Sequence, residues 1–329
     1  MNVDQVLISF FAMVCLVQFG FLEQGFGQEK EGLTKTEQLS QVAQKLTQKK
    51  YLLEYKFKKG ERVYWETEQV DSGEVSLQKK KEVTKSRTLS TKKWRIDEVL
   101  ANGDFVVVQS IEQVDLWQQI DNNPPISYDS KIDTRPHPRF EDVADTVGIE
   151  LVSFKAKKTG ELVYKKANYS DVDLGVGGII VQFPQTPVSI GAKWYQPSVI
   201  KTPLPTGQIK KIKIRRAFEL LEVKFDVAVI SVNTQILTPV RDPEVEVQIM
   251  HQITKGQIRF DIKTGRILTR EFKWNRTAQG FSTADSLKKY IGRFKESMKS
   301  KQEIDLAASS AVKDSVQIKL IGAGPIFRD

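Results

Sequence analysis

The sequence predicts a mainly β protein: a large curved antiparallel sheet or partly open β-barrel, arranged as a hairpin meander of one or two lobes and covered by one or two helices. Two observations predict it. Triplets of a polar residue, a glycine and a polar residue recur, and glycine accepts the positive φ that tight hairpin turns require. Between them, apolar and polar side chains alternate with a period of two, as in strands with one buried face. The triplets are centred on Gly60, Gly73, Gly103, Gly160, Gly256 and Gly265.

Residues 1–27 are predicted to be a signal peptide. Residues 6–22 form an apolar run, and Gly25 and Gly27 then supply small side chains that suit cleavage after residue 27. The mature protein is therefore expected in the periplasm or the extracellular space. Membrane anchoring through residues 6–22 is the alternative, because the run is nearly long enough to span a bilayer. Since residues 1–5 contain no Lys or Arg, translation is expected to begin upstream.

The composition indicates a basic, cysteine-free mature chain. Cys15 is the only cysteine and falls inside the apolar run, so disulfides, thiol catalysis and Cys-ligated zinc are excluded after cleavage. Removal of residues 1–27 deletes two acidic residues and no basic one, which raises the formal net charge from +9 to +11. Such a charge attracts anionic lipids, acidic polysaccharide or nucleic acid. No specific nucleic-acid binding is expected.

The first half of the mature chain is expected to contain a helical lead-in and a β lobe. Residues 28–50 include Thr34 and Glu37, which can form a capping box before a short apolar stripe. The lobe spans residues 51–167. Its opening strand alternates, and an apolar strand over residues 105–114 should be central. The apolar side chains of the opening strand are Tyr51, Leu53, Tyr55 and Phe57.

The second β lobe is expected over residues 168–321. It should contain strands near residues 225–229 and 244–253, the latter with one wet face, and a helix near 284–299. An apolar stripe opposite five basic residues predicts this helix. Residues 322–329 are expected to be a tail, and the proline-rich stretches 121–150 and 175–207 long crossing loops. The stripe consists of Leu287, Tyr290, Ile291, Phe294 and Met298.

Three segments carry a resemblance to known proteins: Tyr55–Glu61, Phe183–Trp194 and Phe260–Ile267. They resemble stretches of uncharacterised exported β-rich bacterial proteins. More distantly, the sequence is similar to envelope lipoprotein-carrier and lipid-carrier proteins, in which a curved antiparallel sheet covered by helices holds an acyl chain. The resemblance implies that fold and a binding role. It transfers no ligand residue, because fold alone does not define function.

The chain contains no recognisable catalytic or metal-binding motif. His251 is expected on the buried face of a strand, and His137 lies in a loop; neither belongs to a spaced ligand cluster. Asp171 and Asp173 lack the further acids of a calcium loop. We find no phosphate loop and no nucleophile elbow. We therefore predict neither enzyme activity nor a cofactor, although a metal-independent hydrolase using two carboxylates stays open.

Two basic runs supply candidate anion-binding residues. On a strand, residues 211, 213 and 215 share one face while Ile212 and Ile214 point to the other. A second run spans residues 79–95. A solvated sheet face, or lysines that guard an edge against aggregation, explains the same pattern. The candidates are Lys79, Lys81, Lys93, Arg95, Lys211, Lys213 and Arg215.

These observations favour an exported, non-enzymatic binding protein of the cell envelope or extracellular space. One hypothesis is a carrier that shelters an apolar ligand on the concave side of its sheet. The alternative is an interaction protein whose basic face meets an anionic surface.

Overall fold

The computed structural model describes residues 49–167, 180–204 and 206–304. The chain divides into two units, residues 1–43 and 44–329, and every described residue belongs to the second. The predicted signal peptide, most of the helical lead-in, Asp171, Asp173 and the C-terminal tail lie outside the described residues. Among the described helices, none has the length and hydropathy needed to cross a bilayer.

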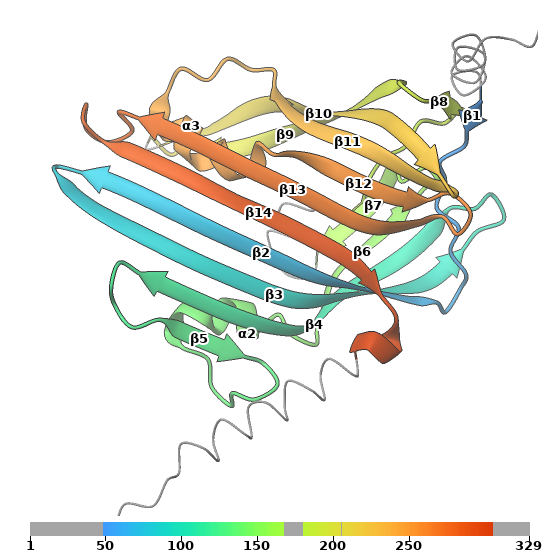
Figure 1. Ribbon diagram of the computed structural model, residues 1–329, viewed down its shortest axis with the longest axis horizontal. Coiled ribbons are helices and arrows are strands. Elements are labelled where there is room, and N and C mark those ends of the chain that lie inside the picture. The colour runs from blue at the N-terminus through green and yellow to red at the C-terminus, as the bar shows by residue number, and fades with distance from the viewer. Residues whose placement is uncertain (1–48, 168–179, 205, 305–329) are drawn as a thin grey trace, which may run out of the picture. The chain divides into compact units, whose positions relative to one another are not determined.

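The described residues form a large antiparallel sheet of twelve strands (Figure 1). Its order is β7-β6-β4-β3-β2-β14-β13-β12-β11-β10-β9, with β5 paired to β4; β1 and β8 form a separate two-stranded sheet. The predicted open, mainly β architecture is confirmed. The strands are β1 (Lys50–Tyr51), β2 (Arg62–Leu77), β3 (Lys80–Val99), β4 (Phe105–Ile120), β5 (Ile126–Asp129), β6 (Glu150–Ala156), β7 (Leu162–Ala167), β8 (Val188–Ser189), β9 (Lys193–Pro203), β10 (Ile209–Lys224), β11 (Val227–Ile236), β12 (Lys255–Asp261), β13 (Arg266–Gln279) and β14 (Leu287–Lys299).

The two sequence spans predicted as lobes are the two halves of this one sheet. The pairing of β2 with β14 joins them along almost the whole of both strands, from Tyr64 opposite Lys299 to Ser76 opposite Leu287. One hydrophobic core draws residues from both halves, for example Trp94 from β3 and Phe260 from β12. The halves therefore share their interior.

At one end of the sheet, which we call the closed end, an extended segment of the chain packs against the strands. Leu53, Tyr55 and Phe57 are buried as the alternation predicts, yet residues 52–58 lie outside the regular strands. The Tyr55 ring contacts Phe183 at 5.3 Å and Phe260 at 5.7 Å between centroids. The three segments that carry the family resemblance thus meet in one aromatic cluster, and their residues serve the fold.

A glycine and an arginine fix this closure. Gly265 has φ +67°, and a Cβ there would lie 2.5 Å from the Lys56 nitrogen, so the approach requires glycine. Next to it, Arg266 places Nη2 2.6 Å from both Glu61 oxygens and lies over the Phe57 ring. The turn between β12 and β13 is thereby held against the extended segment.

The helix predicted near 284–299 is wrong: this segment is β14, in the middle of the sheet. It pairs along its length with β13 and β2. Phe294 is buried, Tyr290 lies on the same face, and Ile291 is on the opposite, exposed face. Hydrogen bonding on both sides outweighs the helical stripe, and Gly292 disfavours a helix interior.

The strand predicted over 244–253 is also wrong, because it is helix α3 (Pro243–Ile249) followed by the 3-10 turn η2 (Met250–Gln252). The Asp242 side chain accepts a hydrogen bond from the Glu244 nitrogen, and Pro243 occupies the first turn. Both features start helices. Val245 and Ile249, four residues apart, are the buried positions and pack on β9 and β10.

Four of the six predicted glycine turns are present, at Gly60, Gly103, Gly160 and Gly265, each with positive φ. The other two glycines are not in turns: Gly73 lies inside β2 and Gly256 inside β12. The predicted loop 121–150 contains β5, the 3-10 turn η1 (Pro138–Phe140) and helix α2 (Glu141–Ala144), and β9 lies within the predicted loop 175–207. The strand predicted over 225–229 starts later, because Phe225 is a fully exposed turn residue.

Candidate functional site: two pockets on opposite faces of the central strands

The central strands β3, β2, β14 and β13 have an inward and an outward face. We call inward the face that carries Trp65 and Trp94 and contacts α3 and η2. Strand alternation assigns every other residue to it. Near the closed end this face is aromatic and buried. Farther along the same strands it becomes polar, and a pocket opens there.

A buried ion cluster marks the change from aromatic to polar. Arg270 Nε and Nη2 lie 2.7 and 2.6 Å from Glu296 Oε1, and both side chains are 1% exposed. Lys92 donates to Glu296 Oε2 and sits over the Trp65 ring. Although burial opposes ionisation, the charges of Arg270 and Lys92 hold the pKa of Glu296 below its ordinary value. Burial, partly offset by Glu296, lowers the pKa of Lys92 to about 8.

Beyond this cluster lies a pocket of about 330 Å³, which we call the inner pocket. Tyr290 Oη donates to Asp71 Oδ1 over 2.7 Å, and Gln69 Nε2 donates to Asp71 Oδ2 over 2.8 Å. Burial raises the pKa of Asp71 despite these bonds, and burial together with Asp71 raises the pKa of Tyr290. The inner pocket is lined by Asp71, Gly73, Val75, Glu82, Thr84, Ser86, Lys288 and Tyr290 from the sheet, and by Val247, Met250 and His251 from α3 and η2.

The outward face of the same strands carries a hollow of about 710 Å³, which we call the basic hollow. Its residues come from five strands aligned by register, β4, β3, β2, β14 and β13. Val70 pairs with Arg87 on one side and with Arg293 on the other. Arg293 pairs in turn with Lys273, and Arg87 with Trp117. Its outward-facing residues are Val70, Ser72, Lys85, Arg87, Trp117, Lys273, Ile291 and Arg293.

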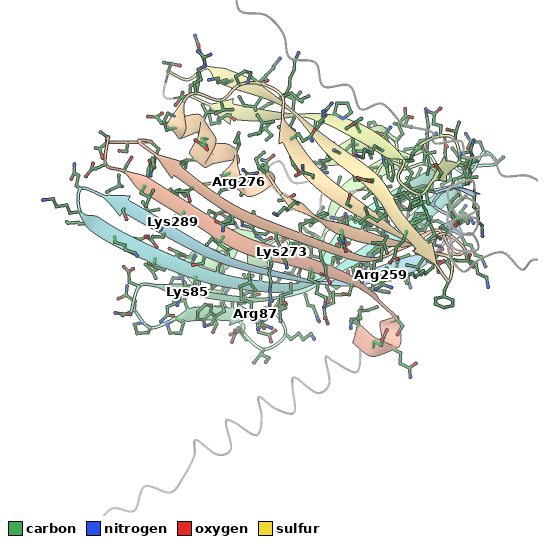
Figure 2. The ribbon with its side chains drawn as sticks, turned by 45° about the horizontal axis from the view of Figure 1, so that its top comes forward. Lys85, Arg87, Arg259, Lys273, Arg276 and Lys289 are labelled. Carbon is green, nitrogen blue, oxygen red and sulfur yellow. The ribbon has the colours of Figure 1, made fainter. Side chains whose placement is uncertain are left out.

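The charges of the basic hollow are unbalanced. Arg87 and Arg293 share one carboxylate, Glu68, at 3.3 and 3.4 Å. Lys85 and Lys273 make no ion pair with any residue in the described part of the chain. Glu68 therefore offsets one of four positive charges. In Figure 2, Lys85, Arg87 and Lys273 lie along the central strands, with Lys289 farther toward one end.

The sequence-predicted anion residues are not brought together. Lys211, Lys213 and Arg215 do share the outward face of β10, with Ile212 and Ile214 buried behind them. Arg215 stacks on Tyr195 at 4.4 Å and hydrogen-bonds Gln235. The other four lie on or beside β3, which is separated from β10 by five strands.

Three residues of the β3 group have carboxylate partners. Lys81 pairs with Glu74 at 3.0 Å, and Lys93 with Glu112 at 2.6 Å. Arg95 pairs with Asp97 and Glu150, and hydrogen bonds to both raise its pKa. Lys79 is a turn residue with φ +67°. None of the four cations of the basic hollow is among the seven candidates. Lys85 and Arg87 belong to the predicted basic run, whereas Lys273 and Arg293 are placed beside them only by strand register.

The two histidines have different settings. His137 Nδ1 accepts a hydrogen bond from the Arg139 nitrogen, 3.2 Å away, and so caps η1. His251 lies in η2 and lines the inner pocket, not the face of a strand as predicted. Among the described residues there is no group of three or more His, Cys, Asp or Glu side chains suited to hold a metal ion.

Comparison with known proteins gives no family. No family model matches the chain, and no curated protein matches its sequence. Among solved structures, one of lipovitellin described for its lipid–protein interactions shares 13% identity at a TM-score of 0.41 and covers 74% of this chain. The match spans only 26% of lipovitellin.

Two further solved structures align over much of the chain. The translocator domain of the autotransporter NalP from Neisseria meningitidis shares 8% identity, with a TM-score of 0.27 and coverage of 80% of this chain and 94% of that one. A DUF1329 family protein from Desulfovibrio piger shares 9%, with a TM-score of 0.15 and coverage of 69% and 83%. Together, fold and pockets define a class: an open antiparallel β protein with a basic outward hollow.

Proposed function

We propose that the protein is a non-enzymatic binding protein whose basic hollow holds an anionic amphiphile, a lipid with an anionic head group. The observation that carries this proposal is the composition of the hollow. Val70, Ile291 and Trp117 offer apolar contact, while the cations of neighbouring strands surround it. An anionic head group would bind the cations, and the first part of an acyl chain would cover the apolar side chains.

The inward face supports an apolar ligand less well. Near the closed end it is filled by the aromatic cluster around Tyr55. The inner pocket, on the same face, is lined by Asp71, Glu82 and Lys288 among others. An acyl chain there would desolvate charged groups without replacing their hydrogen bonds. We therefore place the proposed lipid site on the outward face, and not on the helix-covered face where the carrier hypothesis expected it.

Partial pairing with Glu68 leaves the hollow able to attract anions. Exposed ion pairs such as Arg87–Glu68 are weak, so Arg87 can exchange Glu68 for a phosphate or carboxylate. Arginine recognises both groups in bidentate fashion, and lysine contributes a point charge. Binding should consequently weaken as salt increases.

The test compares two double variants of equal charge. Lys85→Gln with Lys273→Gln removes the lysines of the basic hollow; Lys211→Gln with Lys213→Gln removes two exposed lysines of β10. Sedimentation with phosphatidylglycerol vesicles should show about tenfold weaker binding for the hollow variant, equivalent to about 1.4 kcal/mol, and little change for the β10 variant. Equal losses would mean that net charge, and no specific site, drives binding.

Solvent extraction of the purified protein followed by mass spectrometry identifies the source of the amphiphile. A stoichiometric anionic lipid supports a carrier of single molecules. A clean extract together with salt-sensitive vesicle binding supports docking on a lipid surface. A clean extract with no vesicle binding would reject the proposal.

Absence of catalysis and export from the cytoplasm belong to the same proposal. The membrane-anchored alternative rests on residues 6–22, which lie outside the described residues. Cell fractionation with N-terminal sequencing of the mature protein tests export. Recovery of a chain that still carries residues 1–27 in membranes would favour the anchor.

A further inference from the structure

The inner pocket is formed around a glycine that the fold does not need. Gly73 lies in the middle of β2, paired with Thr84 and Tyr290, and has no positive φ. A Cβ there would meet only Tyr290 Cδ2, at 4.0 Å. Gly256 differs, because a Cβ at that position would collide with the Glu271 carbonyl oxygen. A glycine inside a strand often marks a bulge, a bend, or a site where a ligand or another backbone approaches closely. The pairing at Gly73 has no register shift, and no backbone atom lies within 4 Å of the position its Cβ would take.

The register places opposite charges at one end of the pocket and hydroxyl groups near its middle. Lys288 and Glu82 both pair with Val75, one on each side. Deeper along the strands, Thr84 and Tyr290 flank Gly73. Glu82 is exposed and Lys288 half-buried, so this end meets solvent. The pocket thus runs from a charged mouth to a polar interior.

Asp71 lies on the inward face beyond Gly73 and retains hydrogen-bonding capacity. Tyr290 donates to one of its oxygens and Gln69 to the other, and the Trp274 side chain approaches the same carboxylate. A carboxylate offers about four acceptor sites in all, so further donors can be accommodated. The pocket contributes two carboxylates, Asp71 and Glu82, against one ammonium, Lys288, while His251 faces Asp71 from η2.

We propose that the inner pocket binds a small polar organic molecule that carries an ammonium group. The ammonium would hydrogen-bond Asp71 while the ring of Tyr290 and the sulfur of Met250 contact its carbon atoms. Thr84 and Ser86 are available for hydroxyl groups of the ligand. Burial penalises the ionised form of Asp71, and a cation beside it relieves that penalty. This site is on the face opposite the basic hollow and does not depend on the proposed function.

An organic cation fits better than a metal ion. The described residues contain no group of three or more His, Cys, Asp or Glu side chains that could hold a metal ion. The pocket volume of about 330 Å³ is at the lower end of the range for small-molecule sites. The walls also mix aliphatic, aromatic and hydroxyl groups, which suits a molecule with a carbon frame.

The test is isothermal titration calorimetry of the full chain with ethanolamine, 1,4-diaminobutane and glucosamine at millimolar concentration, with glucose as the neutral comparator. At least one amine should bind, and glucosamine should bind more tightly than glucose. Asp71→Asn should weaken amine binding about tenfold, since a charge-assisted hydrogen bond is lost. Gly73→Val should also abolish binding, because its side chain occupies the pocket while suiting a strand.

Ser76→Val is the matched control, on the same strand but on the other face and outside both sites. It should leave amine affinity and the melting temperature unchanged. Gly73→Val should keep wild-type binding to phosphatidylglycerol vesicles, so failure here is distinct from failure of the basic hollow. The proposal is overturned if none of the three amines binds, if glucose binds as tightly as glucosamine, or if folded Gly73→Val binds amines as the wild type does.

Discussion

The two ends of the central strands differ in what surrounds them. At the closed end, the extended segment around Tyr55 packs against Phe183 and Phe260 within a hydrophobic core. Toward the other end, the same strands carry Asp71 and Lys288 inward and basic residues outward. The segments most conspicuous in the sequence therefore stabilise the fold. The candidate sites use residues from strands far apart in the chain.

The largest expected effect is at the closed end. Phe260→Ala should lower the free energy of unfolding by about 3 to 5 kcal/mol, because it leaves a cavity beside Tyr55 and Phe183. Phe225→Ala is the matched control: Phe225 is fully exposed at a turn, so its loss should change stability by less than about 0.5 kcal/mol. Urea unfolding measures both. Similar losses for the two variants would contradict the assignment of the core to this end.

The buried ion cluster should give the next largest effect. Glu296→Gln leaves Arg270 and Lys92 without their shared carboxylate and should cost about 3 kcal/mol of unfolding free energy. The folded-state pKa of Glu296 is depressed, so its stabilisation is present above the ordinary glutamate pKa and is lost as pH falls through the folded value. The wild type should therefore approach the variant in stability in acid. A constant difference between the two from neutral to strongly acidic pH would contradict this.

The fold class was predictable because strand alternation and turn glycines are local signals. Tyr55 and Phe57 alternate correctly, and four predicted turns exist. The helix prediction for residues 287–299 failed because this sequence fits both a helical and a strand period. Leu287, Ile291 and Met298 suit the apolar stripe of a helix. Tyr290 and Phe294 instead share one strand face with Met298. Pairing with β13 and β2 decides between them, and that pairing is not local.

The helix at Pro243–Ile249 shows the opposite error. Val245, Val247 and Ile249 alternate like a strand, but Asp242 and Pro243 form a helix start that outweighs alternation over so few residues. For the sites, the basic run at 79–95 was visible in the sequence. Which of its members face Lys273 and Arg293 depends on strand register, and no local pattern reveals it.

The two strand glycines should respond differently to the same change. Gly256→Ala forces a methyl group against the Glu271 carbonyl and should cost about 1 to 3 kcal/mol, as overpacking does. Gly73→Ala should be neutral or stabilising by up to about 1 kcal/mol, since alanine is less costly than glycine to order in a strand. Thermal and urea unfolding of the pair provide the measurement. If the two variants destabilise the protein equally, Gly73 is needed for packing, and its lack of a side chain does not indicate a ligand site in the inner pocket.

The smallest expected effect concerns Asp71, the second inward carboxylate. Its pKa is raised by burial, so the folded state binds a proton more tightly than the unfolded one. Its contribution is complete below the ordinary aspartate pKa and is lost as pH rises through the folded value. At neutral pH Asp71 is ionised in both the folded and the unfolded protein, and burying this charge lowers the stability of the folded state.

Asp71→Asn removes that cost while its amide oxygen still accepts from Tyr290 Oη, and the Gln69 amide can rotate to present its oxygen. Stability at neutral pH should therefore change by less than about 1 kcal/mol, whereas amine binding falls. Acidification should favour the wild type over this variant, the reverse of the trend for Glu296→Gln. Urea titrations at neutral and mildly acidic pH compare the two variants directly. If Asp71→Asn destabilised the protein as much as Glu296→Gln, Asp71 would be a structural ion-pair partner. The polar end of the strands would then stabilise the fold, as the closed end does, although its residues differ.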